Sequence, residues 1–245
     1  MPTTLIRGWL RDWVILLRFA RRRFRGDAHY QRFQRYQARL LMRFLRQRGV
    51  DFRQRVLDLG CGKGGYSRAL CIAGAEVVSL DRASLGSLPT ILVQGDAVSL
   101  PFANDSFPFV LCASLVEHVR QPRLLLDEIK RVVSPGGLAY VSFPPFYSPV
   151  GGHQFKPYHL LGERLAIRLS GFHCEGYATC FGDYGLYPIT IRWARRMLSG
   201  AGWQIESVST RFLPLNVARI PLIGEFLTWH VQFVVRKPFN THRAK

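Results

Sequence analysis

The stretch Val56-Leu57-Asp58-Leu59-Gly60-Cys61-Gly62-Lys63-Gly64-Gly65 decides the fold of this chain of 245 residues. It begins with apolar residues, changes to glycines and continues into Tyr66-Ser67-Arg68-Ala69-Leu70. This order predicts a buried strand, a tight loop and the start of a helix. Glycines allow the loop backbone to approach a ligand closely and to adopt positive φ angles. Because open α/β sheets bind ligands at the carboxyl ends of their strands, we expect half of a nucleotide-type pocket here.

Three acidic residues indicate the kind of nucleotide. Asp58 stands just before the glycines, and Asp81 and Asp96 each end one of the next two apolar runs. The sequence therefore predicts carboxylates at the ends of three successive strands. Such carboxylates suit a cofactor that carries positive charge, a ribose and an adenine.

The glycine spacing leaves a second class of cofactor open. Gly60, Gly62 and Gly65 satisfy the dinucleotide pattern G-x-G-x-x-G. A pyrophosphate would be repelled by Asp58 in its own loop, however. S-Adenosylmethionine carries a sulfonium, an ammonium and a free ribose diol but no phosphate, so the carboxylates favour it.

Further motifs follow in a characteristic order. They are Asp58-Leu59-Gly60-Cys61-Gly62-Lys63-Gly64, Asp81, Gly95-Asp96-Ala97, Leu100-Pro101-Phe102, Asp105-Ser106-Phe107 and Val133-Ser134-Pro135-Gly136-Gly137. With them, residues 56–143 resemble a class I S-adenosylmethionine-dependent methyltransferase of the broad bacterial UbiE-like (methyltransferase type 11) group. The chain departs from that family at Pro108, where an Asp is usual, and this affects a structural turn rather than the cofactor residues.

Alternating strand and helix patterns predict an α/β fold with a parallel sheet covered by helices on both faces. The resemblance implies a Rossmann-like, seven-stranded, mostly parallel sheet with an antiparallel last strand. Strands are expected at 56–60, 76–81, 91–95, 107–113, 138–143, 203–211 and 230–236. Helices are expected at about 65–73, 122–133 and 189–201.

The resemblance also implies roles for individual residues. Gly60, Gly62 and Gly64 should pass close to the methionine part of the cofactor, and Asp58 should help to hold its amino group. Asp81 should accept both ribose hydroxyls, and Asp96 should accept from the adenine amino group. The expected cofactor-binding set is completed by Cys61, Arg82, Ala97 and Ser114. The alternative for a strand-end Asp is that it only caps the next helix.

Histidines are the candidates for catalysis. An oxygen nucleophile usually needs a base, and imidazole titrates near neutral pH. His153 is the first choice, with His159 and His118 as further candidates. Each has the alternative interpretation of a structural histidine bonded within the fold. No Asp cluster follows the fourth strand, so we expect no metal.

The positive charge is concentrated at the N-terminus. The net charge is +18, and the first 55 residues hold 15 Arg and 3 Asp, a net charge of +12. Apolar residues recur at helical spacing over 5–24 and over 28–47, with Asp27 as the expected N-cap of the second helix. The longest apolar run, 13–17, is too short to span a bilayer.

The first helix has three open interpretations. Trp9, Trp13, a basic face and an apolar face suit a helix that binds anionic membrane surfaces through residues 1–25. The same pattern suits a helix packed over the core or a partner. A nucleic-acid arm is the third interpretation, and we consider it the weaker one.

Composition changes divide the chain. We predict N-terminal basic amphipathic helices over 1–50 and a methyltransferase domain over 51–245, with insertions at about 144–188 and 213–227. The first insertion is rich in Gly, Pro, His and aromatic residues. A long loop in a compact domain is usually functional, so we interpret it as a lid or substrate pocket.

The predicted function is methyl transfer to a small-molecule, glycan or lipid-linked acceptor, at an oxygen. The alternatives are a nicotinamide-dependent oxidoreductase and a non-catalytic, cofactor-binding membrane adaptor. Five cysteines without a C-x-x-C pair favour a reducing compartment. The expected location is the cytoplasm, either free or peripheral on the inner face of a membrane.

Overall fold

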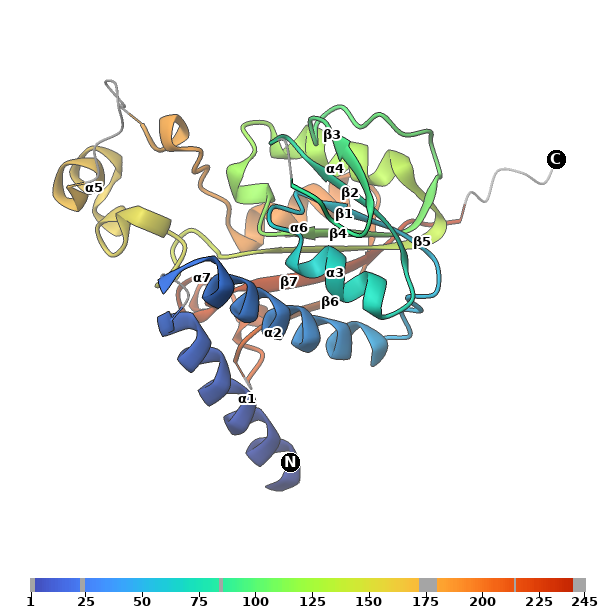
Figure 1. The fold of residues 1–245 in the computed structure, drawn as a ribbon. Coiled ribbons are helices and arrows are strands. Elements are labelled where there is room, and N and C mark those ends of the chain that lie inside the picture. Colours follow the sequence, from blue (N-terminus) through green and yellow to red (C-terminus); the bar gives the residue numbers. More distant parts are fainter. Residues whose placement is uncertain (1–2, 23–24, 84–85, 172–179, 214, 240–245) are drawn as a thin grey trace. The chain divides into compact units, whose positions relative to one another are not determined.

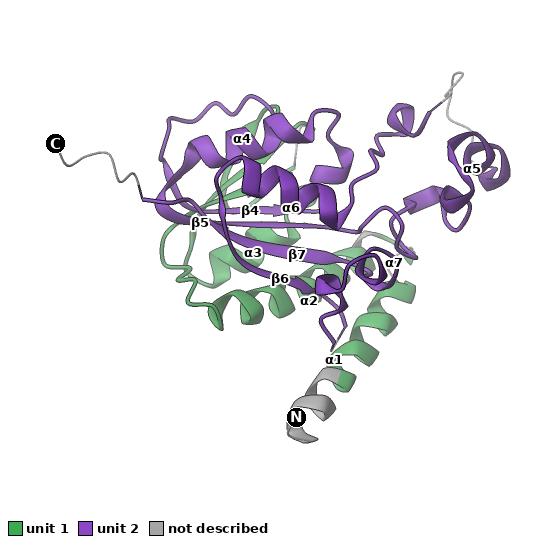
Figure 2. Cartoon of the chain, turned by 180° about the vertical axis from the view of Figure 1, so that it is seen from behind, with its two compact units in different colours: residues 1–96 green, residues 97–245 purple. Residues whose placement is uncertain are grey.

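The computed structural model describes residues 3–22, 25–83, 86–171, 180–213 and 215–239. The chain divides into two compact units, residues 1–96 (unit 1) and 97–245 (unit 2) (Figure 2). This division differs from the boundary predicted near residue 50, which stays a prediction.

Unit 1 begins with two helices of 20 residues, α1 (Thr3–Arg22) and α2 (Asp27–Arg46), which pack against each other (Figure 1). The carboxylate of Asp12 on α1 accepts hydrogen bonds from the Tyr36 hydroxyl at 2.9 Å and the Arg43 guanidinium at 2.7 Å, both on α2. Burial and this acceptor raise the pKa of Tyr36 to about 12. The contacts support the packed-helix interpretation for one face of α1.

Two expectations for this region need comment. Asp27 is not the N-cap of α2, because Gly26 holds that position, and none of the described side chains caps the helix. Glycine is itself tolerated as an N-cap. Phe24 and the side chains of residues 5–9, which carried part of the predicted apolar face, lie outside the described residues.

The sheet of unit 1 is parallel. It consists of β1 (Arg55–Leu59), β2 (Glu76–Asp81) and β3 (Ile91–Gln94) in the order β3-β2-β1. Helix α3 (Gly65–Ile72) follows the glycine loop after β1. β1 and β2 are almost wholly buried, as the continuous apolar runs of parallel strands require.

Unit 2 contains β4 (Phe107–Ala113), β5 (Val133–Phe143), β6 (Gln204–Thr210) and β7 (Val231–Arg236), in the order β4-β5-β7-β6. β4 and β5 are parallel, whereas β7 is antiparallel to both β5 and β6. The predicted fold class is therefore confirmed: a seven-stranded α/β fold with an antiparallel last strand.

Helices α4 (Pro122–Val132) and α6 (Ile191–Gly200) lie on the same face of the sheet of unit 2 (Figure 2). Each begins with a favourable residue. Pro122 occupies the first turn of α4, where its missing N–H costs nothing. Thr190 caps α6 by accepting from the backbone N–H of Trp193 at 3.0 Å.

The two insertions are more regular than predicted. The first contains the helix α5 (Glu163–Ser170), and the second contains the short helix α7 (Ile223–Leu227). Treating residues 144–188 as a loop was wrong over α5. This helix has two turns and buries only Ala166, so its apolar periodicity is too short to stand out in the sequence.

Candidate functional site

The glycine loop after β1 has the backbone geometry that the sequence predicts. Gly60, Gly62 and Gly64 have φ angles of 72°, 51° and 71°, a region that residues with a Cβ rarely adopt. The backbone N–H groups of Gly60 and Cys61 both donate to the carbonyl oxygen of Leu80, at 2.8 and 3.2 Å. These bonds hold the loop against the end of β2.

Asp81 connects this loop to the turn after β2. One carboxylate oxygen accepts from the backbone N–H of Gly62 at 2.9 Å, and the other accepts from that of Ala83 at 3.0 Å. Among the described residues no helix follows β2 before β3, so Asp81 holds a turn and does not cap a helix. Each carboxylate oxygen offers a second lone pair, so these bonds leave capacity for the two hydroxyls of a ribose.

Asp58 lies one strand away and is only 2% exposed. It accepts from the Ser67 hydroxyl at 2.5 Å, and the hydroxyl of Ser79 donates to that of Ser67 at 2.9 Å. Burial raises the pKa of Asp58 to about 6, although the bonds from Ser67 oppose this shift. The chain of three side chains joins β1, α3 and β2.

Sequence reasoning missed Ser67 and Ser79 as parts of the site. The available signal was weak: a hydroxyl on the first turn of α3, and a single polar residue inside the apolar run of β2. Both side chains are fully buried. A buried hydroxyl requires a hydrogen-bond partner, which points back to the nearest carboxylate.

Four other predicted cofactor residues have mixed surroundings. Asp96 and Arg82 are exposed, whereas Ala97 and Cys61 are buried. Burial, with the nearby carboxylates of Asp58 and Asp81, raises the pKa of the Cys61 thiol to about 12. Cys61 is therefore an inert thiol that contributes its backbone to the loop.

In unit 2, His118 and His153 come together. His118 ends the 3₁₀ helix η2 (Val116–His118) after β4, and His153 begins η3 (His153–Phe155) in the first insertion. Their ring centroids are 4.9 Å apart. Nδ1 of His118 donates to the carbonyl oxygen of Gly185 at 2.7 Å, and Nδ1 of His153 donates to that of Gly151 at 3.1 Å. In the neutral form of each ring, Nε2 would then be the unprotonated nitrogen.

Two features indicate that this pair is under constraint. His153 has a φ angle of 48°, which is uncommon outside glycine and clusters at functional sites. Burial lowers the pKa of His153 to about 4, so its ring is neutral at physiological pH. Glu117, next to His118, is 2% exposed, and burial raises the pKa of its carboxyl to about 8.

The third predicted histidine has different surroundings. His159 is 2% exposed and packs edge-on against Phe146, with ring centroids 5.3 Å apart. It borders the apolar cluster of the first insertion, whose members are Phe146, Phe155, Ala166, Phe181 and Leu186. Burial lowers the pKa of His159 as well.

Ser114 and His230 form a further pair that sequence reasoning did not anticipate. Ser114 follows β4 with a φ angle of 57°, and its hydroxyl lies 3.0 Å from Nε2 of His230. Burial lowers the pKa of His230 well below its ordinary value. The one sequence signal was a histidine directly before the apolar run of β7.

Comparisons with known proteins agree with this architecture. Residues 57–141 match the family model described as a methyltransferase domain. A methyltransferase of Mycolicibacterium vanbaalenii is 30% identical over 200 residues, which cover 74% of this chain and 75% of the relative. A methyltransferase of Mycolicibacterium gilvum is 31% identical over 198 residues, with the same coverage.

Solved structures share the fold at lower identity. The S-adenosylmethionine-dependent methyltransferase of Mesorhizobium loti has a TM-score of 0.53 and 21% identity, and covers 74% of this chain and 90% of its own. A SAM-dependent methyltransferase of Methanosarcina mazei has a TM-score of 0.52 and 17% identity, and covers 76% of this chain and 92% of its own.

The chain belongs to the methyltransferase family, in its class I, S-adenosylmethionine-dependent branch. Its cofactor is S-adenosyl-L-methionine. The residues present fit this group, because Asp81 keeps free acceptor capacity and the space that a side chain at Gly62 would fill is open. No finding supports the nicotinamide-dependent or non-catalytic alternatives.

Among the described residues, no helix is both long and apolar enough to cross a bilayer.

Proposed function

We propose that this methyltransferase acts on an oxygen of a small-molecule, glycan or lipid-linked acceptor, and that the histidine pair of unit 2 activates that oxygen. The supporting observation is the pair itself: two imidazoles from separate segments with ring centroids 4.9 Å apart, each bonded through Nδ1 to a backbone carbonyl. Each pair member has a nitrogen left to face an acceptor.

Most of the residues that would hold the cofactor belong to unit 1, and Ala97 and Ser114 belong to unit 2. In this proposal Asp81 accepts the ribose hydroxyls, Asp96 accepts from the adenine amino group, and the loop of Gly60, Gly62 and Gly64 passes along the methionine part. Asp58 acts on the cofactor ammonium either directly or through a water. Cys61, Arg82, Ala97 and Ser114 complete the set.

The chemistry divides between cofactor and protein. When bound, S-adenosyl-L-methionine supplies an activated methyl group on its sulfonium. The protein has to position the acceptor in line with it and to help its hydroxyl proton to leave. An imidazole nitrogen can help the hydroxyl proton to leave in two ways. It can accept the proton itself, or it can hold another group that makes the hydroxyl more acidic. His153 is the first choice for this role, and His118, whose ring lies beside it, and His159 are the further candidates.

Transfer of a labelled methyl group tests the proposal. The wild type and the variants His153→Ala, His118→Ala and His159→Ala should be supplied with panels of hydroxylated small molecules, glycans and lipid-linked sugars. We expect one panel to accept the label, and His153→Ala to lower the rate by about 100-fold or more. Labelling at nitrogen or carbon only, or full activity of all three variants, would contradict the proposal.

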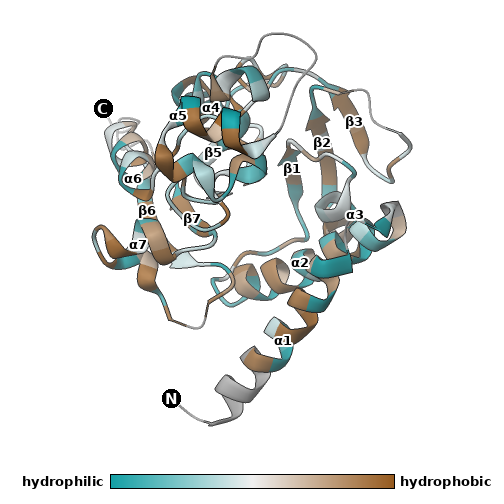
Figure 3. Cartoon of the chain, turned by 90° about the vertical axis from the view of Figure 1, so that its left-hand side faces the viewer, coloured by the Kyte–Doolittle hydropathy of each residue, from teal (hydrophilic) through white to brown (hydrophobic). Residues whose placement is uncertain are grey.

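We also propose that the N-terminal region binds anionic membrane surfaces. One face of α1 packs on α2, but Leu10 is 48% exposed and Val14 is 61% exposed. These residues are four positions apart and share a face. In Figure 3, apolar and polar segments alternate along α1. An apolar face left uncovered beside many arginines is typical of a helix at a membrane interface.

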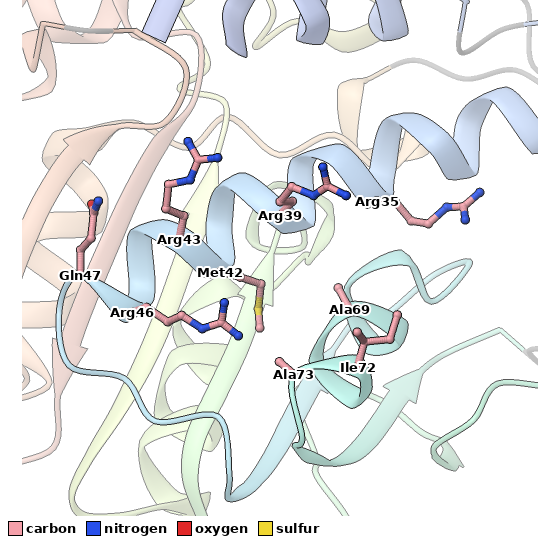
Figure 4. Close-up of a pocket in the computed structure, with 9 residues that line it drawn as sticks. All are labelled: Arg35, Arg39, Met42, Arg43, Arg46, Gln47, Ala69, Ile72 and Ala73. Carbon is pink, nitrogen blue, oxygen red and sulfur yellow. The ribbon is translucent and has the colours of Figure 1, made fainter. Parts of the chain in front are cut away.

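A groove in unit 1 adds to this argument. It lies between α2 and α3 and has a volume of about 470 Å³ (Figure 4). Its lining includes Arg35, Arg39, Arg43 and Arg46, no acidic residue, and apolar side chains of α3. Arg43 already pairs with Asp12. Each basic residue near an anionic bilayer contributes roughly 1 kcal/mol, so the other three can hold a headgroup region reversibly.

Flotation with vesicles tests the membrane proposal. The full chain should float with anionic vesicles and not with neutral ones, and salt should weaken binding because it screens charges beyond about 10 Å at 0.1 M. Leu10→Asp with Val14→Asp should reduce flotation, whereas Leu124→Asp, at a 44% exposed position of α4, should not. Equal flotation of the wild type and the double variant would show that the exposed apolar face of α1 does not contribute to membrane binding. Failure of the wild type to float would leave only the packed helix.

A further inference from the structure

Three side chains of unit 2 place ligand atoms close together. One nitrogen or oxygen atom from each of Glu117, His118 and His153 lies within 4.8 Å of the other two. Glu117 and His118 are consecutive on η2, and His153 comes from the first insertion. The fold therefore assembles this group from two separate segments.

Both imidazoles are oriented as metal ligands usually are. A ligating histidine almost always donates its other ring N–H to a carbonyl or carboxylate, which fixes its tautomer and direction. Here Nδ1 of His118 donates to Gly185 and Nδ1 of His153 donates to Gly151. Nε2 of each ring is thus the atom available for coordination.

Glu117 is the independent second observation. It is 2% exposed, and among the described residues no side chain forms a hydrogen bond to either carboxylate oxygen. A buried carboxylate without a partner is costly. A bound cation beside it would remove that cost.

We propose that Glu117, His118 and His153 bind a divalent first-row transition-metal ion such as zinc. Two imidazole nitrogens and one carboxylate oxygen suit these ions, whereas magnesium and calcium prefer oxygen ligands throughout. Three protein ligands with a fourth position open is the arrangement of catalytic zinc sites. The proposal departs from the expectation of no metal, because sequence spacing did not show that His153 meets Glu117.

Coordination requires a small closure of the group. A tetrahedral ion with bonds of about 2.1 Å holds its ligand atoms roughly 3.4 Å apart. The three ligand atoms lie within 4.8 Å of one another without an ion, so each spacing would have to shorten by at most about 1.4 Å. His118 is the exposed member of the group.

The role of the ion rests on the proposed function. The acceptor hydroxyl would take the open position, where the ion lowers its pKa, as it does for bound water. The hydroxyl proton leaves to solvent, and the oxygen forms its bond to the methyl carbon. The carbon–sulfur bond breaks, and its electron pair stays on sulfur. In this arrangement the two imidazoles hold the metal ion that lowers the pKa of the hydroxyl. His153 itself does not accept the proton.

Metal binding tests the inference without any acceptor. The full-length chain, stripped with a chelator, should be titrated with cobalt(II) and with zinc in competition. We expect one equivalent of cobalt, visible d–d absorption bands without thiolate charge transfer, and displacement by zinc. His118→Ala, His153→Ala and Glu117→Gln should each weaken binding tenfold or more, whereas His29→Ala on α2 should not.

The outcomes separate two kinds of failure. Absence of cobalt binding to the wild type, thiolate bands, or unchanged affinity in both histidine variants would overturn the inference. Should Glu117→Gln fail to fold, His118→Ala decides, because that side chain is exposed. Titration with S-adenosylhomocysteine in parallel reports on the cofactor residues of unit 1. Metal binding without methyl transfer to oxygen would contradict the proposed function but not the site.

Discussion

Asp58 and Asp81 are one strand apart in unit 1 and have different surroundings. Asp58 is buried and accepts from Ser67, whereas Asp81 is half-buried and accepts from two backbone N–H groups. The first arrangement ties secondary-structure elements together. The second presents a carboxylate beside the glycine loop, where a ligand can reach it. At the scale of single residues, Asp81 is thus the better candidate for direct cofactor contact.

Asp81→Ala should raise the dissociation constant for S-adenosylhomocysteine by about 10- to 100-fold. Hydrogen bonds to a charged group are worth roughly 1.5–3 kcal/mol, and each 1.4 kcal/mol is tenfold. Calorimetric titration measures the effect. Asp81→Asn is the matched control, since its amide oxygen keeps one acceptor for Gly62, and it should lose less affinity. Unchanged affinity in a folded Asp81→Ala protein would refute the assignment.

Asp58 should make stability depend on pH. Burial raises its pKa from 3.8 to about 6, so the folded state binds this proton more tightly than the unfolded state. Its stabilising contribution is complete below about pH 4 and is lost as the pH rises through about 6. Relative to Asp58→Asn, the wild type should lose on the order of 3 kcal/mol across this window. Urea unfolding between pH 4 and 7 measures this, and parallel curves for the two proteins would show the expectation to be wrong.

At the scale of elements, the first insertion is held by close backbone contacts. A Cβ at Gly151 would meet the backbone carbonyl oxygens of Pro145 and Phe146. The carbonyl of Gly151 in turn accepts from His153. The path of this segment therefore requires glycine at position 151. The orientation of the His153 ring, a candidate for catalysis, depends in turn on that path.

Gly151→Ala should destabilise the protein by roughly 1–3 kcal/mol, because backbone atoms cannot move aside as side chains do. Gly200→Ala is the control. That glycine ends α6, and no atom lies within 4 Å of a Cβ built there, so the substitution should be neutral or slightly stabilising. Thermal unfolding compares the variants. Equal melting temperatures for both would argue against the tight path of the insertion.

At the scale of the whole molecule, the two kinds of site residue fall in different units. The glycine loop and the three aspartates belong to unit 1, and the histidines belong to unit 2. The charge is also divided, because the first 55 residues carry +12 of the net +18. In the proposed function, cofactor binding thus falls mainly to unit 1, acceptor activation to unit 2 and surface attraction to the N-terminal helices.

Substitutions in the two units should impair different steps, namely cofactor binding in unit 1 and methyl transfer in unit 2. His153→Ala should leave the S-adenosylhomocysteine dissociation constant within about twofold of the wild type, while lowering the rate of methyl transfer by about 100-fold or more. Asp81→Ala should weaken cofactor binding first. Parallel calorimetry and rate measurements check this. Equal loss of cofactor affinity in both variants would show that the division is wrong.

Much of the fold was predictable because its signals are local. The ranges of β2 and β4 were predicted to the residue, and the glycine loop was placed correctly before α3. Continuous apolar runs, glycines and strand-end carboxylates lie within a few residues of one another. The helix α5 was missed because a short, mostly exposed helix gives little apolar periodicity.

The sequence by itself determined the class of fold and the family, and it named candidate cofactor residues, since each depends on neighbouring positions. Only the tertiary structure decided which distant side chains meet. Ser114 contacts His230 across 116 positions, and His153 lies beside Glu117 and His118. These contacts form because the start of β7 and the first insertion both lie next to the segment that follows β4. The physical reason is that non-local packing sets this path, and no short stretch of sequence contains it.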